Sequence, residues 1–271
     1  MTNLPYALEA HPFFSWVFTA VGAVFFVASA VWALTSSRRL STAIPVLALA
    51  GGFIAALEEP WINTMIQLWY PRDSPLIAFI AMEHAQPLYV FLVYPGFVGL
   101  GAYVVYRSLV THPDGRHLWR FFAGIVLLDL VFELPTTAAG VFYYYGDQPM
   151  QLVSNGWPFW AGPINAAGPL LAGWLMYRLV PVLSGARRIF VVVALPPLAY
   201  AGIYGAVGWP VYTLLKTDVP MAARWAAAVV TIALCVGTVA MIKLSLSRSA
   251  DETVRFGDDA PHMAIDKAEQ R

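Results

Sequence analysis

Charged residues are scarce in this sequence. Only 12% of its 271 residues are Asp, Glu, Lys or Arg, whereas ordinary soluble domains contain about 25%. Hydrophobic residues make up 59% of the chain, and the mean hydropathy is +0.64. A soluble domain of ordinary composition is therefore excluded. The composition predicts an integral protein of the cell (inner) membrane that crosses the bilayer several times.

Features that several function classes require are also missing. Basic and acidic residues number 16 each, so no excess of positive charge predicts nucleic-acid binding. The single cysteine, Cys235, excludes an internal disulfide and a cysteine-rich metal cluster. No two histidines have metal-ligand spacing inside an apolar segment, and no phosphate- or dinucleotide-binding glycine motif occurs in a usable context. We therefore expect no metal, no cofactor and no nucleic-acid partner.

Seven apolar segments are each long enough to cross the bilayer as a helix. We expect the spans at 12–36, 41–62, 86–106, 119–145, 158–180, 188–215 and 222–246. The fold class is then an all-α membrane protein, with a seven-helix transmembrane domain over residues 1–246. The first segment follows a stretch without Lys or Arg and is too long for a cleaved signal peptide. Residues 247–271 are polar, which predicts a disordered cytoplasmic tail.

Lysine and arginine are distributed unequally between the two sides of these spans. Thirteen of the sixteen fall on one side, and only Arg72, Lys216 and Arg224 fall on the other. Because basic residues are retained on the cytoplasmic side, we expect the N-terminus outside and the C-terminus in the cytoplasm. The partly apolar segment 71–85 is too short to span, and it either lies in the outer interface or re-enters the membrane.

The fourth predicted span carries two carboxyl groups, Asp129 and Glu133. At about 1.5 Å per residue, Asp129 lies near the middle of the membrane and Glu133 about 6 Å further out. Their spacing of four residues places both on one helix face. No Lys or Arg lies at this depth, and a carboxylate in hydrocarbon costs at least about 2.5–3.5 kcal/mol. We therefore expect at least one of them to be protonated and to face a cavity, as a general acid would.

Other predicted spans place polar and aromatic side chains in the same layer, between the middle of the membrane and its outer surface. Glu58 and Glu59 lie near the outer end of the second span, and Asn165 lies in the outer half of the fifth. The candidate catalytic residues are therefore Glu133, Asp129, Glu59 and Glu58. The candidate substrate contacts are Trp61, Asn63, Tyr144, Trp157, Asn165, Tyr204, Trp209 and Tyr212.

Structural roles for these residues remain open alternatives. Asp129 and Glu133 could hydrogen-bond within the bundle instead of acting on a substrate. One of Glu58 and Glu59 could be solvated at a helix end, and the aromatic residues could form an interfacial belt. Asn165 could join two helices through a hydrogen bond.

Five segments, taken in order, resemble a known family. They are GGFIAALEEPWIN, FLVYPGFVGLGAYV, DLVFELPTTAAGVFYYYG, NGWPFWAGPINAAGPLLAGWL and AYAGIYGAVGWPVYTLL. Together they are similar to the AveC-like spirocyclase family of actinobacterial polytopic membrane proteins. The resemblance covers roughly residues 45–215 and is carried mainly by Asp129, Glu133, Pro135 and Gly140, with Glu59 and Pro60 as a second acid-proline element. It implies an enzyme of secondary metabolism that closes or dehydrates a spiroketal ring.

The function expected from these observations is acid–base ring closure without a cofactor. An apolar polyketide or isoprenoid substrate would enter from the membrane, and a carboxylic acid would protonate it. Aromatic faces would stabilise the resulting cation, and a second carboxylate would remove a proton. Two alternatives remain open: a cation-initiated transmembrane terpene cyclase or carotenoid hydratase, and a non-enzymatic proton-coupled carrier or lipid-binding protein.

Overall fold

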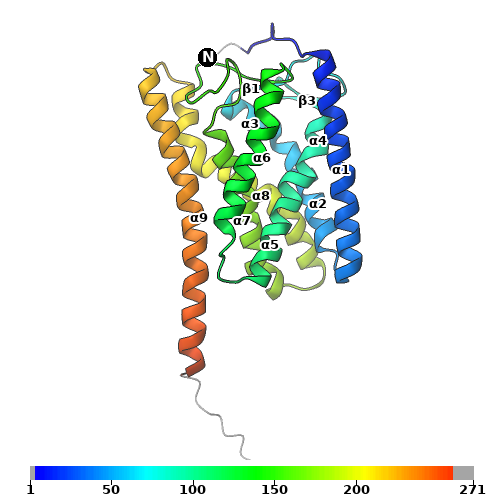
Figure 1. The fold of residues 1–271 in the computed structure, drawn as a ribbon, viewed down its shortest axis with the longest axis vertical. Coiled ribbons are helices and arrows are strands. Elements are labelled where there is room, and N and C mark those ends of the chain that lie inside the picture. The colour runs from blue at the N-terminus through cyan, green and yellow to red at the C-terminus, as the bar shows by residue number, and fades with distance from the viewer. Residues whose placement is uncertain (1–3, 259–271) are drawn as a thin grey trace, which may run out of the picture.

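The computed structural model describes residues 4–258, and most of them are helical. The longer helices form an elongated bundle (Figure 1). They are α1 (Pro12–Leu40), α2 (Ile44–Ala55), α5 (Gly101–Thr111), α6 (Leu118–Ala138), α7 (Ala161–Leu179), α8 (Gly185–Leu215) and α9 (Met221–Asp258). The shorter helical pieces are η1 (Ala56–Glu58), α3 (Glu59–Ile66), α4 (Leu88–Tyr94), η2 (Pro95–Leu100) and η3 (Val180–Val182).

Six helical segments are long and apolar enough to cross a membrane. They are Pro12–Leu40, Ile44–Ile66, Leu88–Thr111, Leu118–Ala138, Gly185–Leu215 and Met221–Leu246. The prediction of a helical, membrane-integral protein is confirmed at this level. The predicted span 158–180 contains α7, which is largely buried inside the bundle. Because α7 is shielded by other helices, it carries polar and small residues that a lipid-facing helix would not.

The ends of the predicted spans differ from the observed helices at one functionally relevant place. The fourth span was expected to continue to residue 145, but α6 ends at Ala138. Pro135 lacks an amide hydrogen, and Gly140 adopts a left-handed φ of 72°, so the chain turns away from the helix axis. Tyr144 consequently lies in a strand, not in a helix. The predicted tail begins within α9, and its residues 259–271 lie outside the described part.

One end of the bundle carries two short antiparallel strand pairs, and we refer to it as the strand end. Strand β1 (Leu68–Trp69) pairs with β4 (Tyr143–Tyr144). Strand β2 (Ile77–Ala81) pairs with β3 (His84–Pro87). Part of segment 71–85 belongs to this second strand pair, and its placement in the outer interface or within the membrane stays a prediction. The β1–β4 pair joins the end of α3 to the segment after α6, and this brings two acid-bearing helices together.

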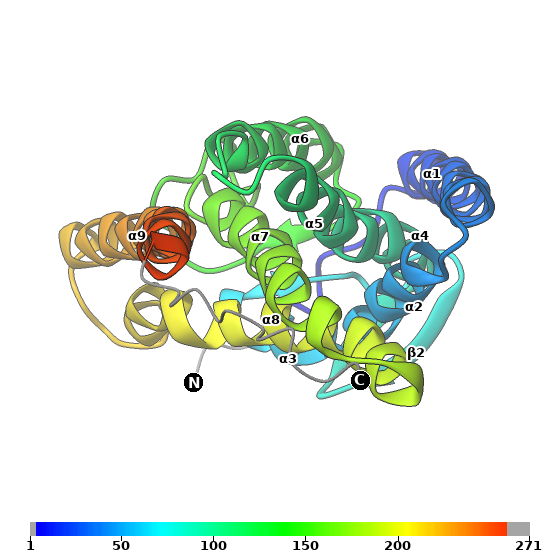
Figure 2. The same ribbon diagram turned by 90° about the horizontal axis from the view of Figure 1, so that it is seen from below.

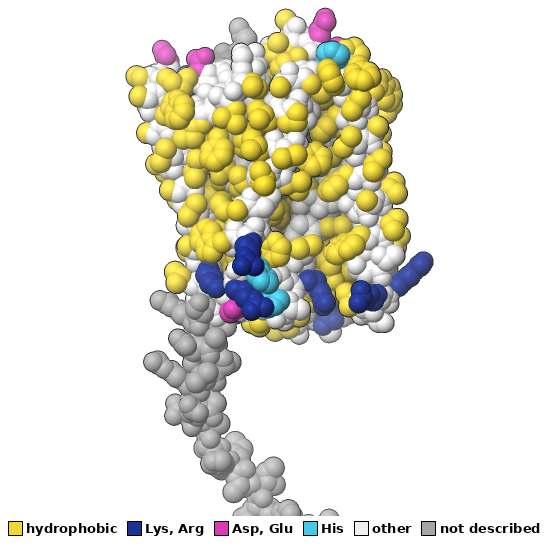
Figure 3. Space-filling model, viewed as in Figure 1, with side chains coloured by type: hydrophobic (Ala, Val, Ile, Leu, Met, Phe, Trp, Pro, Cys, Tyr) yellow, Lys and Arg dark blue, Asp and Glu magenta, His cyan; other side chains and the backbone are white. Residues whose placement is uncertain are grey.

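Charged side chains are segregated along the bundle axis. Lys and Arg side chains gather at the end opposite the strands, here called the basic end, and acidic side chains are visible mainly at the strand end (Figure 3). Hydrophobic side chains cover the surface between the two ends. This is the surface expected of a protein whose middle faces hydrocarbon and whose ends face water.

Helix α7 occupies the centre of the bundle (Figure 2). Its glycines allow neighbouring helices to approach closely: a Cβ atom at Gly173 would lie 2.6 Å from the carbonyl oxygen of Ala102 in α5. On the opposite side, a Cβ atom at Gly168 would meet the ring of Tyr200 in α8. Asn165, one turn before Gly168, is therefore held among several helices and is only 4% exposed.

Candidate active site inside the bundle

A cavity of about 90 Å³ lies inside the strand-end half of the bundle. Such a volume holds a few water molecules or a slender hydrocarbon segment. Its wall combines apolar side chains with three carboxyl groups, one amide and six phenols. These polar residues are Glu59, Asp129, Glu133, Asn165, Tyr70, Tyr89, Tyr94, Tyr144, Tyr200 and Tyr204.

Asp129 and Glu133 project from one face of α6 into this cavity, as their spacing predicts. Asp129 accepts a hydrogen bond from Asn165 Nδ2 at 2.9 Å and another from Trp157 Nε1 at 3.2 Å. Glu133 accepts one from the Tyr144 hydroxyl at 2.6 Å. Both carboxyl groups also lie within hydrogen-bonding distance of the same Asn165 Nδ2 atom. Two negative charges this close in a buried site repel each other, which favours a proton on one of them.

Asn165 connects the acid pair to α8. Its Nδ2 atom donates to Asp129 and, at 3.5 Å, to Glu133. Its Oδ1 atom accepts from the hydroxyl of Tyr200 at 2.9 Å and from the hydroxyl of Tyr204. The amide is thereby fixed on both sides, and its orientation directs N–H groups at the carboxyls.

Glu59 lies at the start of α3 and reaches the same cavity from another side. It is 4% exposed, and it accepts hydrogen bonds from the Tyr70 hydroxyl at 2.6 Å and from the Tyr94 hydroxyl. The ring of Tyr94 packs against the ring of Tyr200, whose hydroxyl donates to Asn165. Phenol hydroxyls therefore lead from Glu59 towards Asn165 and the acid pair.

Two of these phenols, Tyr70 and Tyr144, lie outside the membrane-spanning segments. Burial first, and the negative charge of nearby carboxyls second, raise the pKa of Tyr70 and the pKa of Tyr144 well above the usual value. Both tyrosines therefore remain neutral O–H donors at physiological pH.

No basic side chain of the described residues forms an ion pair with the three acids. Among the described residues the only ion pair joins Arg224 and Asp147 near the strand end, where Asp147 is exposed. The cavity acids are therefore supported by neutral donors alone. Buried charges are normally paired, so three unpaired carboxyl groups in one cavity are typical of a site that binds or transfers protons.

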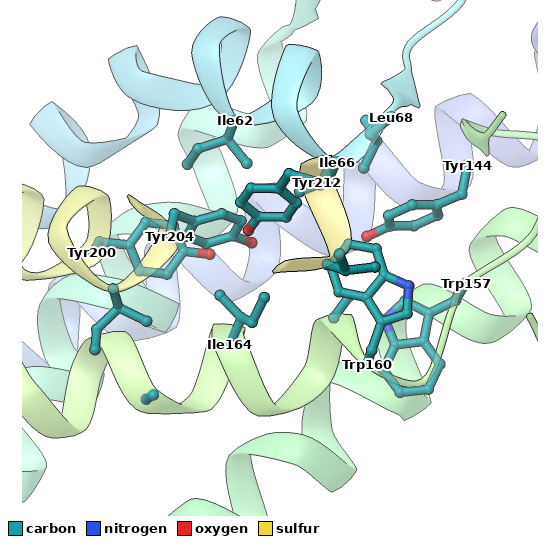
Figure 4. Close-up of a cluster of buried hydrophobic side chains, with 14 of the residues drawn as sticks. Ile62, Ile66, Leu68, Tyr144, Trp157, Trp160, Ile164, Tyr200, Tyr204 and Tyr212 are labelled. Carbon is teal, nitrogen blue, oxygen red and sulfur yellow. The ribbon is translucent and has the colours of Figure 1, made fainter. Parts of the chain in front are cut away.

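Aromatic rings make up much of the cavity wall. The rings of Tyr94 and Tyr200 meet edge to face at 5.6 Å, and those of Tyr200 and Tyr204 lie 5.1 Å apart. In Figure 4 the hydroxyls of Tyr144 and Tyr204 point towards the centre of the cluster from opposite sides. Ring faces of this kind attract cations, with a contribution of about 2 kcal/mol or more when the site is dry.

Several candidate residues lie outside the cavity wall. Glu58 points elsewhere, and its Oε2 atom is buried without a hydrogen-bond partner among the described residues. Asn63 is fully buried, and both atoms of its amide also lack a partner there. Trp61 and Tyr212 pack in the surrounding core. Trp209 is 58% exposed on the outer face of α8, so it lies on the bundle surface.

The remaining candidates lie in or against the cavity. Tyr144, Asn165 and Tyr204 line it together with Glu59, Asp129 and Glu133. Trp157 is fully buried behind the acid pair and reaches it through the hydrogen bond to Asp129. The bundle thus brings together residues from four of the predicted spans. These residues share one predicted depth in the membrane, which is the feature that marks them as a candidate site.

Sequence reasoning missed part of the wall. Tyr70 and Tyr94 contact Glu59 directly, and Phe25 contributes from α1. Tyr94 precedes Pro95 inside an apolar segment, which is a weak signal of a polar group at a helix irregularity. Phe25 has no such signal, because it is one apolar residue among many in α1.

Comparison with known proteins finds no matching family model, no matching curated protein and no matching solved structure. The resemblance to the AveC-like spirocyclase family accordingly depends on the sequence segments quoted above.

Proposed function

We propose that the protein is an integral membrane enzyme that cyclises an apolar substrate by acid–base chemistry, without a cofactor. The observation that carries the proposal is the Asp129–Glu133 pair: two neighbouring carboxyl groups that face a cavity with aromatic walls and have no cationic partner among the described residues. The proposal names Glu133 as the acid, Glu59 as the base and Asp129 as the group that positions the acid.

Glu133 is the better candidate for proton donor. Both oxygens of Asp129 accept hydrogen bonds from N–H groups, which cannot accept in return. This arrangement suits Asp129 as a carboxylate. The partner of Glu133 on its other side is the Tyr144 hydroxyl, which can donate or accept, so a protonated Glu133 can keep that contact while its hydrogen is directed at a substrate.

A substrate cation formed by this proton would lie between tyrosine rings. Tyr94, Tyr200 and Tyr204 line the cavity between the acid pair and Glu59. Their negative ring faces favour a carbocation or oxocarbenium ion over its neutral precursor. Confining the reactive end of the chain in this narrow cavity would lower the entropy cost of ring closure.

Glu59 is placed to end the reaction by accepting a proton. It receives two phenol O–H donors, which stabilise a carboxylate, and it lies across the cavity from α6. Tyr94 donates to Glu59, Tyr200 donates to Asn165, and their rings are in contact, so these two phenols offer a route for returning the proton towards the acid pair. The enzyme then recovers its starting state without an external cofactor.

The cellular setting follows from the charge asymmetry. We propose that the basic end faces the cytoplasm, that α7 is the seventh span, and that the cavity lies in the half of the cell membrane away from the cytoplasm. Spiroketal formation, as the AveC-like resemblance implies, is one reaction that this chemistry supports.

The decisive test is a comparison of host lipids by untargeted mass spectrometry. Cells that carry the wild-type gene, the Glu133→Gln variant or no gene would be extracted and compared. We expect a product of unchanged mass, or of one water fewer, only with the wild type. A full yield of that product from Glu133→Gln would overturn the proposal.

Glu58 provides a matched control for Glu59. The two residues are neighbours, but only Glu59 lines the cavity. We expect Glu59→Gln to lower product formation by at least about 100-fold, as expected when a general base is lost, while Glu58→Gln retains it. The opposite result would assign the base role to Glu58.

A proton-coupled carrier is the second candidate, because unpaired intramembrane acids also suit proton binding. The same cavity would then bind its ligand without changing it. Purified protein in vesicles separates the two: an enzyme converts a lipid extract without net proton movement, whereas a carrier moves protons across the membrane when its ligand is added and leaves the ligand unchanged.

A further inference from the structure

A second hollow lies on the outer surface of the bundle, next to the acid cavity. It is a groove of about 460 Å³ between α1 and the helices η2, α5 and α6, and its wall is almost entirely apolar. Figure 2 shows α1 and α6 apart from each other, with α5 set back between them. All residues that line the groove belong to candidate membrane-spanning helices, so in the proposed orientation the groove faces the membrane hydrocarbon.

The groove adjoins the acid cavity through shared wall residues. Phe25, Phe97 and Leu128 line both. The rings of Phe25 and Phe132 lie 6.2 Å apart across this passage. Because these shared residues are large apolar side chains, a change of their rotamers would connect the groove with the cavity.

At its other end the groove adjoins a pocket at the basic end. Trp32 and Val104 line both the groove and this pocket, which also contains Arg39 and Arg107. The guanidinium groups of both arginines lack a hydrogen-bond or ion-pair partner among the described residues; only the backbone oxygen of Arg107 accepts a side-chain hydrogen bond, from Thr111. The Tyr103 hydroxyl is buried in the same pocket, and it too lacks a partner in the described part of the chain.

The three hollows together form one track along α1. From Arg39 to Phe25 the helix advances 14 residues, or about 21 Å. That distance is close to half the thickness of a bilayer with its headgroup layers, about 20–22 Å. A molecule with an anionic group at Arg39 and Arg107 would therefore need a chain as long as one leaflet to reach the acids.

We propose that the substrate is a long-chain polyprenyl phosphate, and this proposal rests on the proposed function. Its phosphate binds Arg39, Arg107 and the Tyr103 hydroxyl, its chain lies in the groove, and its far end enters the acid cavity. Phosphate matches two unpaired arginines and a free O–H donor. The chain is isoprenoid because a saturated acyl chain has no group at its far end that a carboxylic acid can protonate.

The reaction is an isomerisation. Glu133 transfers its proton to the terminal double bond, which leaves a carboxylate and a tertiary carbocation. The electron pair of the next double bond forms a new carbon–carbon bond and moves the charge along the chain. Glu59 then removes a proton from the adjacent carbon, and a new double bond forms. No electrons are gained or lost, and the phosphate ester stays intact.

Binding can be tested separately from turnover with purified protein in detergent. The probes are hexaprenyl monophosphate, the uncharged alcohol hexaprenol, and dipalmitoyl phosphatidate, which has an anionic head with saturated chains. We expect hexaprenyl monophosphate to bind at least about tenfold more tightly than either of the others, because only it satisfies both ends of the track. Equal binding of hexaprenol or of phosphatidate would overturn the inference.

Two sets of variants locate the head and the chain. The double change Arg39→Gln and Arg107→Gln should weaken binding of hexaprenyl monophosphate at least about tenfold. The control, Arg178→Gln with Arg187→Gln, removes two exposed basic-end arginines that line neither hollow.

Leu128→Trp should hinder the long chain at the passage between groove and cavity, but it should leave the binding of the shorter geranyl monophosphate unchanged. Unaltered binding in the first variant, or equal effects on both chain lengths in the last, would contradict the inference.

Glu133→Gln distinguishes this inference from the function on which it rests. It should bind hexaprenyl monophosphate as the wild type does, and mass spectrometry should find no cyclised product. If Glu133→Gln still forms product, the proposed acid is wrong. If the acid variant behaves as expected but the arginine variants bind normally, only the substrate assignment fails.

Discussion

At the residue scale, Asn165 is the side chain on which the geometry of the acid cavity most depends. It donates to both carboxyl groups of α6 and accepts from two tyrosines of α8. No other side chain in the cavity joins donors and acceptors on two helices in this way. Its amide replaces the cation that would ordinarily accompany buried acids, and it does so without neutralising them.

Replacing asparagine by leucine should change the free energy of unfolding in different ways at Asn165 and at Asn63. Asn165→Leu should lower the free energy of unfolding by about 1–3 kcal/mol, because buried acids and hydroxyls lose their partners. Asn63→Leu should be neutral or stabilising, since the Asn63 amide is fully buried without a partner in the described structure. Thermal unfolding in detergent measures both. Equal losses in the two variants would show that the hydrogen bonds of Asn165 contribute nothing specific.

His84, at the strand end, predicts a pH dependence of stability. Burial lowers the pKa of His84 from about 6.5 to about 4, against smaller opposing effects of a Leu68 backbone hydrogen bond and the Glu83 charge. Between these values the unfolded chain binds a proton that the folded chain does not, so stability falls as pH falls from 6.5 to 4. The loss from this residue reaches up to about 3 kcal/mol.

His84→Gln should reduce that decline, because glutamine does not titrate. Melting temperatures measured from pH 7 to pH 4 would show a shallower slope for this variant than for the wild type. His11→Gln, at an exposed histidine of the same end, should keep the wild-type slope. Parallel slopes for all three proteins would mean that His84 is protonated in the folded state.

At the element scale, the π-helical turn η2 connects the cavity with the groove. Pro95 opens this turn and has no amide hydrogen, so the regular α-helical hydrogen bond cannot form there and the helix widens. Tyr94 before it contacts Glu59, and Phe97 within it lines both hollows. The irregular turn thus places a polar contact and an apolar wall residue within one short segment.

Glycine is required where η2 crosses α2. A Cβ atom at Gly99 would lie 2.2 Å from the carbonyl oxygen of Ala48, so Gly99→Ala should cost about 1–3 kcal/mol through overpacking. Gly124→Ala in α6 is the control, because nothing lies within 4 Å of the added atom. Melting temperature and yield in detergent report the difference. A fully stable Gly99→Ala protein would show that the two helices can separate freely.

At the scale of the whole molecule, the unequal ends of the bundle are the basis of its proposed orientation in the membrane. Its lateral surface is hydrophobic, and its basic side chains lie at one end (Figure 3). The proposed substrate track uses the same asymmetry, because an anionic head belongs at the basic end and a reactive apolar terminus belongs at the cavity. Orientation and substrate direction are therefore linked.

Cysteine labelling tests the orientation. The native Cys235 is fully buried in α9, so it should react little with a membrane-impermeant maleimide. In intact cells, Asp218→Cys at the strand end should be labelled, and Asp114→Cys at the basic end should be labelled only after the cells are opened. The reverse pattern would place the basic end outside and remove the proposed cytoplasmic phosphate site.

The amino-acid sequence by itself determined that this is a helical membrane protein with its basic residues at one end. Asp129 and Glu133 share a helix face because their spacing of four residues matches the helical period. This does not depend on how the other helices pack. Composition and periodicity are local properties, so they can be read from the chain alone.

Only the tertiary structure decided which side chains face the cavity. In a membrane the lipid-facing side of a helix is as apolar as its packed side, so the pattern cannot separate Glu59 from Glu58 or place Trp209 on the surface. The wall positions of Tyr70, Tyr94 and Phe25 likewise result from how distant segments pack. The cavity exists because residues from α1, α3, α4, η2, α6, α7, α8 and the β1–β4 strand pair meet at one place, and no single segment of the sequence contains that information.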